Sequence, residues 1–350
     1  MIVSNPLVLH HEKMGAQLDP AKSPLSFSDP VEEYWAIKKA AGLADISNNG
    51  RLIITGKDRV TFLNGLLTND ITKIAEDGGQ HSALLNPKAR VIADLYLYRQ
   101  PESILVDTGN SPASEIKENL ERFIITEDVQ LQNASTDLVQ LTIQGPRSSQ
   151  VIKDTLGLVV EDLKLLHYKS LGPSSIISRD RTGKGGYDIV LPNEEAEAVW
   201  QGFLLKAGDS GLRPVGSRAM EMLRIEAGYP KYGVDIDQDI IVLEAGFKDA
   251  ISFTKGCYLG QEVVARATHI GRVNKQLVGL EITASAAPLP QSKLISNGVE
   301  VGFITSAVFS PESGKVVGLG YLNRDNAKEG AVLTIDFPNG QHRVLVTKVL

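Results

Sequence analysis

The stretch from Asn274 to Leu350 consists of short runs in which apolar and polar residues alternate, with Gly, Pro and Asn between them. The runs QLVGLEI, VEVGFITSAVF, KVVGLGYL, AVLTIDF and HRVLVTKVL show a pattern that is typical of β-strands. No helical period intervenes. The segment is therefore predicted to form a small β-barrel or sandwich.

Helical and strand periods alternate in the part of the chain before this segment. VEEYWAIKKAAGLADIS has apolar positions at helical spacing up to Gly42, and RLIITG alternates as a strand. KDRVTFLNGLLTNDI places Val60, Leu63 and Leu67 on one face of a helix. A strand over 91–98, a strand at SILVDTG and a helix at SEIKENLERFII complete the first module.

A second module begins at the strand DLVQLTIQGP. It continues with a helix at RSSQVIKDTLG, a hairpin of SIISRD and YDIVLP, and a helix at EEAEAVWQGFLLKAG. The Gly-rich turn inside the hairpin lacks the GK[ST] ending of a phosphate-binding loop. We expect an α+β protein with antiparallel sheets, divided into an irregular lead-in at 1–30, α+β domains at 31–140 and 141–273, and a C-terminal β-barrel at 274–350.

The composition limits the classes of function that the chain can have. Apolar residues make up 42% and charged residues 22%, which is typical of a soluble globular protein. The net charge of −6 argues against broad nucleic-acid binding, and no apolar stretch approaches the roughly 20 residues that span a bilayer. A single cysteine and the absence of a secretory signal pattern favour a reducing, cytoplasmic setting. The pair His10 and His11 is interpreted as solvated loop residues, and no metal site is expected.

The only cysteine lies in the motif KGCYLGQE at residues 255–262. Val263, Val264 and Ala267 share a helical face after Gly260, which predicts a helix that begins near that glycine. Cys257 would then precede a helix N-terminus and lie beside Lys255, and both features favour a reactive thiolate. The alternative is that Cys257 is a small buried apolar residue.

Two further stretches contain candidate ligand contacts. In the strand 91–98, Asp94 shares a side with Ile92, Tyr96 and Tyr98, so it could bind a ligand nitrogen or transfer a proton, unless it is simply solvated. In MLRIEAGYPKYGVDID, the alternation of Leu223, Ile225 and Ala227 with Arg224 and Glu226 predicts a strand that ends at a turn. Arg224 could pair with a carboxylate and Tyr229 or Tyr232 could stack on a flat ring, or Arg224 and Glu226 could merely pair with each other.

Together these stretches resemble the folate-binding YgfZ family, a relative of the glycine-cleavage T-protein (aminomethyltransferase). The resemblance runs from about residue 35 to the C-terminus. It rests on GKDRVTFLNGLLTNDI, LLNPKARVIADLYLYR, LRIEAGYPKYGVDID, LEAGF and KGCYLGQEVVAR, in this order. The resemblance implies a three-domain ring of the T-protein type around a central folate-binding hole, with tetrahydrofolate or a derivative as cofactor. It also implies a role in making or maintaining iron–sulfur enzymes, some of which modify tRNA.

The resemblance also implies a set of site residues. Cys257 would be the functional thiol, with Lys255 and Asp94 as further catalytic candidates. The residues implied in folate binding or as the setting of the thiol are Asp94, Arg224, Glu226, Tyr232, Gly256, Tyr258, Gly260, Gln261 and Glu262.

Two departures separate the chain from T-proteins proper. T-proteins carry two successive acids where this chain has Ala93-Asp94. They also have a turn that resembles TGEDGFEI where this chain has TGKGGYDI. In this turn Lys184 and Gly185 replace the acidic pair of T-proteins, and T-proteins do not carry the cysteine of KGCYLGQE. Both differences favour the YgfZ branch over the glycine-cleavage reaction. If the missing acid is the catalytic one, Asp94 could still bind the pterin.

Three functions remain open from the sequence. The first is a tetrahydrofolate-binding protein that assists iron–sulfur enzymes through Cys257, with folate and iron–sulfur proteins or their assembly machinery as partners. The second is a folate-dependent transferase of aminomethyl or methylamine groups, in which Asp94 polarises a folate nitrogen. The third is a non-catalytic adaptor that has lost the ligand. No membrane or direct nucleic-acid partner is expected, and nothing demands more than a monomer.

Overall fold

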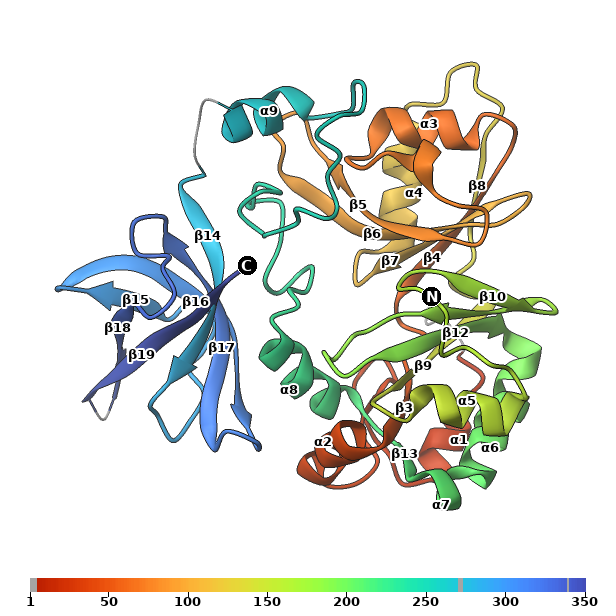
Figure 1. Ribbon diagram of the computed structural model, residues 1–350, viewed down its shortest axis with the longest axis horizontal. Coiled ribbons are helices and arrows are strands. Elements are labelled where there is room, and N and C mark those ends of the chain that lie inside the picture. Colours follow the sequence, from red (N-terminus) through yellow and green to blue (C-terminus); the bar gives the residue numbers. More distant parts are fainter. Residues whose placement is uncertain (1–4, 270–272, 339) are drawn as a thin grey trace. The chain divides into compact units, whose positions relative to one another are not determined.

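A computed structural model describes residues 5–269, 273–338 and 340–350 (Figure 1). The chain divides into two compact units. The first unit contains the residues up to Phe62 together with Thr72–Gln80 and Leu95–Leu223. The second unit contains Leu63–Ile71, His81–Asp94 and Arg224–Leu350. The chain therefore passes between the units several times.

The first unit contains a sheet with the strand order β10-β11-β12-β9-β3-β13. Its neighbours pair antiparallel except β13 with β3. The strands are β3 (Ala41–Asp45), β9 (Leu138–Gln144), β10 (Tyr168–Leu171), β11 (Ser174–Ser178), β12 (Gly186–Pro192) and β13 (Leu212–Pro214). The hairpin predicted around RTGKGG is thus confirmed as β11 and β12.

Helices α5 and α6 pack on this sheet, and α2 contacts its strands β3 and β13. Trp200 and Phe203 of α6 lie in the core that they form with the sheet. α5 ends at Gly157, whose φ of 69° is the left-handed conformation that glycine adopts most readily. The helices that contact this sheet are α2 (Pro30–Lys39), α5 (Ser148–Leu156), α6 (Asn193–Leu205) and α7 (Ala207–Ser210). The helix α4 (Ala113–Glu121) contacts strands of the second sheet instead.

A second sheet has the strand order β5-β6-β7-β4-β8. Two of its strands, β5 and β6, run from one unit into the other. The strands are β4 (Gly50–Thr55), β5 (Gly79–Leu85), β6 (Val91–Arg99), β7 (Ile104–Gly109) and β8 (Gln130–Asn133). Along β6 the buried and less buried residues alternate, which confirms that Asp94 lies on the opposite side from Val91, Ala93 and Leu95.

The N-terminal segment contains regular structure where an irregular lead-in was expected. It forms α1 (Val8–Lys13) and the antiparallel pair β1 (Gln17–Leu18) and β2 (Pro24–Ser26). The interpretation of His11 as a solvated residue is wrong, because its side chain is completely buried. Its Nε2 lies 2.9 Å from Asp45 Oδ2, and its ring packs edge-on against Trp200. A carboxylate partner in the core allows the imidazole to be buried.

The C-terminal part of the second unit is a closed barrel with the strand order β14-β17-β16-β15-β18-β19 (Figure 1). Its strands are β14 (Lys275–Ile282), β15 (Lys293–Ser296), β16 (Val299–Ser310), β17 (Lys315–Asn323), β18 (Val332–Phe337) and β19 (Gly340–Val349). Alternate residues such as Leu280, Ile304 and Val344 fill the interior. The α+β fold with antiparallel sheets and a C-terminal barrel is therefore confirmed.

The strand predicted at LRIEAG is wrong, since these residues end the helix α8 (Ser217–Ala227). The preceding residues are Ala, Met, Glu and Leu, which favour a helix, and Gly228 with a φ of 79° ends it. The remaining helical elements are α3 (Arg59–Leu66), the 3₁₀ turn η1 (Ile71–Lys73) and α9 (Gln261–His269). None of the described helices is long and apolar enough to cross a membrane.

Candidate functional site

Three side chains of the second unit form a chain of contacts centred on an imidazole. His81 on β5 lies with Nε2 2.5 Å from Asp94 Oδ1 on β6 and with Nδ1 2.9 Å from Asp249 Oδ2. The exposed fraction of the side chain is 5% for His81, 16% for Asp94 and 75% for Asp249. An imidazole can donate to two carboxylates only when both nitrogens carry a proton. The two imidazole nitrogens therefore each lie within hydrogen-bonding distance of a carboxylate, one sheltered and one facing solvent.

Asp94 keeps one acceptor atom available for a ligand. Its Oδ1 is occupied by His81, and no described residue hydrogen-bonds to its Oδ2. The interpretation of Asp94 as a solvated residue is wrong, because the carboxyl is mostly sheltered and bonded to an imidazole. A partly buried carboxylate oxygen without a protein partner is suited to accept a hydrogen bond from a ligand N–H group.

Asn69 fixes the positions of His81 and Asp249. Its Nδ2 donates to the backbone oxygens of His81 at 2.9 Å and of Asp249 at 2.8 Å. Thr68 supports the same loop, because its Oγ1 donates to the Ala250 oxygen at 2.6 Å. Phe247 packs edge-on against the His81 ring with 4.8 Å between the ring centroids. These contacts hold the imidazole in a single orientation.

Lys255 of the KGCYLGQE motif is bound to the same loop. Its Nζ donates to the backbone oxygens of Asn64 at 2.5 Å, Leu67 at 2.8 Å and Asn69 at 2.8 Å. Burial lowers the pKa of Lys255 to about 8, and the nearby Asp70 carboxylate opposes this shift. An ammonium has three N–H donors, so all of them are used by carbonyls. Lys255 therefore has no donor left for the Cys257 sulfur.

Cys257 is exposed, so the interpretation of this residue as a small buried apolar residue is wrong. It precedes α9, which begins at Gln261, as the sequence pattern predicts. Gly260 has a φ of 83°, and a Cβ there would lie 2.8 Å from the Asn86 oxygen, so this position requires glycine. Gly256, beside the cysteine, has open space around it.

The other residues of the motif have different environments. Tyr258 is buried, which raises the pKa of its hydroxyl to about 12, and its ring lies 5.2 Å from the Lys255 Nζ. Gln261 is partly exposed at the start of α9. Glu262 is exposed and pairs with Arg266 one turn later on α9. Of the KGCYLGQE residues described above, only Lys255 contacts a residue that holds His81. That residue is Asn69, whose backbone oxygen accepts from Lys255.

Arg224 belongs to another set of contacts within the second unit. Its Nη1 donates to Asp235 Oδ2 at 2.7 Å and its Nη2 to Ser306 Oγ at 3.1 Å. Thr305 and Ser306 donate to the second oxygen of Asp235. Arg224 and Asp235 are both buried. Arg224 thus joins the end of α8 to the barrel strand β16, and its proposed folate contact stays a prediction.

Glu226 and Tyr232 are the last two predicted contacts. Glu226 lies partly exposed on α8, two residues after Arg224. Tyr232 is partly buried and forms an isolated bridge with Ile236. Both residues take part in further interactions, so neither is free. Their predicted roles in folate binding stay predictions.

His81 and Asp249 are not predicted as site residues by any pattern in the sequence. Their contact joins residues 168 positions apart, and no local pattern reveals such a pair. The available signal was the histidine in GQHSALL, the mostly buried strand β5 that pairs with β6, the strand of Asp94. Among the described residues, no group of three His, Cys, Asp or Glu is arranged to hold a metal ion.

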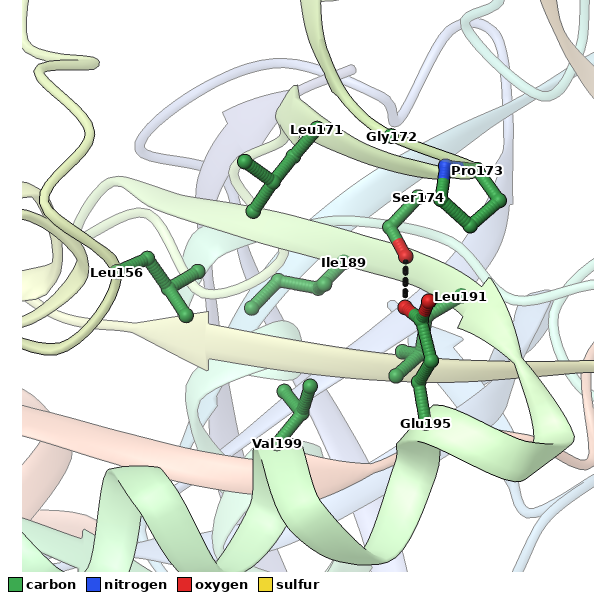
Figure 2. A pocket seen from close by; sticks show the side chains of 9 residues that line it. All are labelled: Leu156, Leu171, Gly172, Pro173, Ser174, Ile189, Leu191, Glu195 and Val199. Carbon is green, nitrogen blue, oxygen red and sulfur yellow. Dashed lines mark hydrogen bonds between the residues drawn. The ribbon is translucent and has the colours of Figure 1, made fainter.

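The first unit contains a pocket of about 340 Å³ that none of these residues line (Figure 2). Its walls are mainly the apolar side chains of Leu156, Leu171, Ile189, Leu191 and Val199. Ser174 Oγ donates to Glu195 at 2.8 Å at one edge of the pocket. The pocket offers apolar contact and no group suited to acid–base chemistry beyond this paired carboxylate.

Comparisons with known proteins define the class of the chain. The model of the GCVT N-terminal domain matches residues 10–255, and that of the glycine cleavage T-protein C-terminal barrel domain matches residues 275–349. A solved structure of the glycine cleavage system aminomethyltransferase T from Bartonella henselae has a TM-score of 0.91 and 26% identity, and covers 98% of this chain and 96% of that chain. The fold is therefore that of an aminomethyltransferase.

Curated relatives lead to the same family. The aminomethyltransferase of Desulfitobacterium hafniense is 31% identical over 342 residues, which cover 94% of this chain and 92% of the relative. That of Caldanaerobacter subterraneus subsp. tengcongensis is 30% identical over 323 residues, which cover 90% and 86%. The chain belongs to the glycine cleavage T-protein family. The wider part of the resemblance inferred from the sequence is thus confirmed.

Proposed function

We propose that the protein binds tetrahydrofolate at Asp94 and acts as a folate-dependent transferase of one-carbon groups, as its aminomethyltransferase relatives do. The observation that carries this proposal is the carboxyl of Asp94, whose Oδ1 is held by His81 while Oδ2 has no partner among the described residues. An oriented carboxylate with an unused acceptor can bind or deprotonate a ligand nitrogen.

The available acceptor suits a reduced pterin. Tetrahydrofolate presents several N–H donors on its ring, and when bound it supplies a nitrogen that carries the one-carbon group. Asp94 would accept one of these N–H groups through Oδ2. His81 would keep the carboxyl from rotating away, and Asp249 would hold the imidazole from its other side.

The difference from the two successive acids of T-proteins supports the same role. Ala93 is completely buried on the apolar side of β6, and Asp94 lies on the other side beside His81. Successive residues of a strand face opposite sides, so a carboxyl at position 93 could not share the environment of Asp94. The acid that this chain keeps is the one on the open side. The loss of the other acid therefore does not by itself remove the ligand-binding carboxylate.

His81 and Asp249 add a route for protons. Asp249 faces solvent, and His81 connects it to the sheltered Asp94. A proton taken up at Asp94 can pass through the imidazole to the exposed carboxylate by successive hydrogen bonds. The catalytic candidate in this proposal is Asp94, and His81 and Asp249 are positioning residues.

Anaerobic calorimetric titration of the full-length protein with tetrahydrofolate tests the binding step. We expect saturable binding in the wild type and a loss of affinity of about tenfold or more in Asp94→Asn, which replaces one carboxylate acceptor by an amide. The control is Asp239→Asn, which removes the same charge from an exposed carboxylate of the second unit. Equal affinity in Asp94→Asn and wild type would place the folate elsewhere.

The transfer step requires a separate measurement. Formation of methylene-tetrahydrofolate from an aminomethyl donor, with release of ammonia, would be followed by absorbance with wild type, Asp94→Asn and Asp239→Asn. Turnover in wild type and Asp239→Asn, with at least a hundredfold loss in Asp94→Asn, is the expected result. Folate binding without turnover for any such donor would reject the transferase and retain the binding protein.

A second candidate function is the support of iron–sulfur enzymes that the YgfZ resemblance implies. The observation in its favour is the exposed thiol of Cys257 in KGCYLGQE, for which transfer at Asp94 has no evident use. It is tested in cells that lack the protein, by the activity of an iron–sulfur enzyme after return of wild type or Cys257→Ser. Full recovery with Cys257→Ser would remove the thiol from this function. Recovery with a variant that binds no folate would instead favour the adaptor.

A further inference from the structure

The pocket in the first unit has apolar walls, and none of the residues of the folate proposal line it. Ile189 and Leu191 are two positions apart on β12, so their side chains lie on the same side of the strand, and Val199 of α6 lies beside them (Figure 2). Leu156 ends α5 and Leu171 ends β10, and both add to the apolar wall. The apolar part of a ligand would therefore replace water against apolar side chains on several sides.

The pocket extends from the core of the unit to its surface. Ile189 and Leu191 are 2% and 0% exposed and belong to the hydrophobic core, whereas Leu171 is 41% exposed. Ligand pockets commonly measure about 300–1,000 Å³, and the volume of about 340 Å³ found here lies at the lower end of that range. We therefore expect a small ligand that covers the exposed part of Leu171 when it binds.

A carboxylate with an open acceptor position lies at the edge of the pocket. Glu195 of α6 accepts a hydrogen bond on Oε2 from Ser174 Oγ at 2.8 Å, and Ser174 itself is buried (Figure 2). This bond orients the carboxylate. Its other oxygen, Oε1, has no hydrogen-bond partner among the described residues. The carboxylate can therefore accept a hydrogen bond from a ligand in the pocket.

The charge of Glu195 has no counter-charge in the part of the chain that the structure describes. Of the described residues that line the pocket, Glu195 alone is charged, and it forms no ion pair with them or with any other described residue. Lys169 on the wall strand β10 does not line the pocket, and its Nζ donates to the Val159 oxygen at 2.7 Å. The first turn of α6 also suits a negative charge. A positively charged group of a ligand would complement this edge.

We propose that this pocket binds a small primary amine with an apolar body. The ammonium group donates to Glu195 Oε1, and the apolar body packs against Ile189, Leu191 and Val199. A ligand with a carboxylate, such as the glutamyl part of folate, would place a second negative charge near Glu195 and is disfavoured. The site lies entirely within the first unit, and it does not rest on folate binding at Asp94.

The test is an NMR titration of the full-length protein, labelled at its Ile, Leu and Val methyl groups, with hexylammonium chloride at pH 7 and constant ionic strength. The δ1-methyl resonance of Ile189 is identified by its absence in Ile189→Val. We expect this resonance to shift in a saturable way. Butylammonium, which has two methylene groups fewer, should bind about tenfold more weakly. Hexan-1-ol and hexanoate have a body of the same length without the positive charge, and both should bind more weakly than hexylammonium.

Two matched variants test the role of the carboxylate. Glu195→Gln keeps an acceptor for Ser174 but loses the charge, and we expect about fivefold weaker binding of hexylammonium and unchanged binding of hexan-1-ol. Glu194→Gln removes the same charge from the preceding residue of α6, which is exposed and does not line the pocket. This control should bind hexylammonium as the wild type does, to within about twofold.

Three results would overturn the proposal. An Ile189 resonance that does not move, or that moves without saturation, would show that the pocket takes no such ligand. Hexan-1-ol or hexanoate bound as tightly as hexylammonium would contradict the cation assignment, and this comparison in the wild type needs no variant. Equal losses in Glu194→Gln and Glu195→Gln would exclude a direct contact with Glu195. Because no probe contains a pterin and Asp94 is unchanged throughout, each result is separate from the fate of the folate proposal.

Discussion

Asp235 and Asp94 are both carboxylates of the second unit that hold a basic side chain, but they differ in how many of their acceptor positions are used. Asp235 accepts from Arg224 and the Lys231 N–H on one oxygen and from two hydroxyls of β16 on the other. Among the described residues, Asp94 accepts only from His81, on one oxygen. A carboxylate with all positions filled stabilises the fold, and one with an open position can bind a ligand.

The comparison separates roles that the sequence could not distinguish. Arg224 and Asp94 both appear as candidate folate contacts because both lie in stretches that resemble the family. In the structure, the guanidinium of Arg224 contacts a carboxylate, a carbonyl and a hydroxyl. The variants below therefore differ in whether they change the free energy of unfolding or the binding of ligands.

The largest effect on stability is expected for Asp235→Ala. Removing this carboxylate leaves the buried guanidinium of Arg224 without its counter-charge, and breaking such a pair typically costs about 3–5 kcal/mol. Urea unfolding of the full-length protein measures the change. Asp239→Ala, which removes an exposed carboxylate, should stay within about 0.5 kcal/mol of wild type. A loss below about 1 kcal/mol in Asp235→Ala would contradict a structural role for the pair.

A smaller loss, of about 1–2 kcal/mol, is expected at neutral pH for Lys255→Met, because three backbone carbonyls lose their donor. Its pH dependence has a defined sign. The pKa of Lys255 is lowered to about 8, whereas in the unfolded chain it is near 10.5. Between these values the unfolded state binds more protons, so the free energy of unfolding of the wild type rises with pH.

The measurement for Lys255 is urea unfolding of both proteins between pH 7.5 and 10.5. The gap between wild type and Lys255→Met should widen as the pH rises through this window, since the variant lacks the titrating group. Other lysines and tyrosines titrate in both proteins, and the difference cancels their effects. A gap that stays constant or narrows with pH would show that the pKa of Lys255 is not lowered in the folded state.

For Asp94→Asn, the change in the free energy of unfolding should be below about 1 kcal/mol. Its carboxyl has a single protein partner, and the amide can still accept a hydrogen bond from His81. The same variant should lose folate affinity. We therefore expect a large change in binding and only a small change in the free energy of unfolding. A destabilisation as large as that of Asp235→Ala would mean that Asp94 is also a structural carboxylate, and the contrast between the two would fail.

Much of the fold follows from local patterns. The alternation along the C-terminal strands predicts the barrel, and the helical spacing of Val263, Val264 and Ala267 places α9 correctly. The alternation along β6 also predicts the side on which Asp94 lies. These features depend on residues that are close in the sequence, where the period of the backbone determines which side chains lie together.

The partners in the site do not follow from such patterns. Asp249 reaches His81, and Lys255 reaches Asn69, only after the chain has folded. The burial of His11 depends in the same way on Asp45, which is 34 residues away. The error at α8 has another cause, because the alternation from Leu223 to Ala227 covers too few residues to distinguish a strand from the end of a helix.

The smallest effect on stability is expected for Cys257→Ser. The thiol is exposed, and Lys255, the neighbour predicted to activate it, has all its donors occupied by carbonyls. The free energy of unfolding should therefore change by less than about 0.5 kcal/mol. An aromatic disulfide reagent should label the native wild type fully, without prior unfolding. Incomplete labelling would show a shielded thiol. Full labelling with unchanged stability would group Cys257 with Asp94, as a residue that the fold does not need and that is available for function.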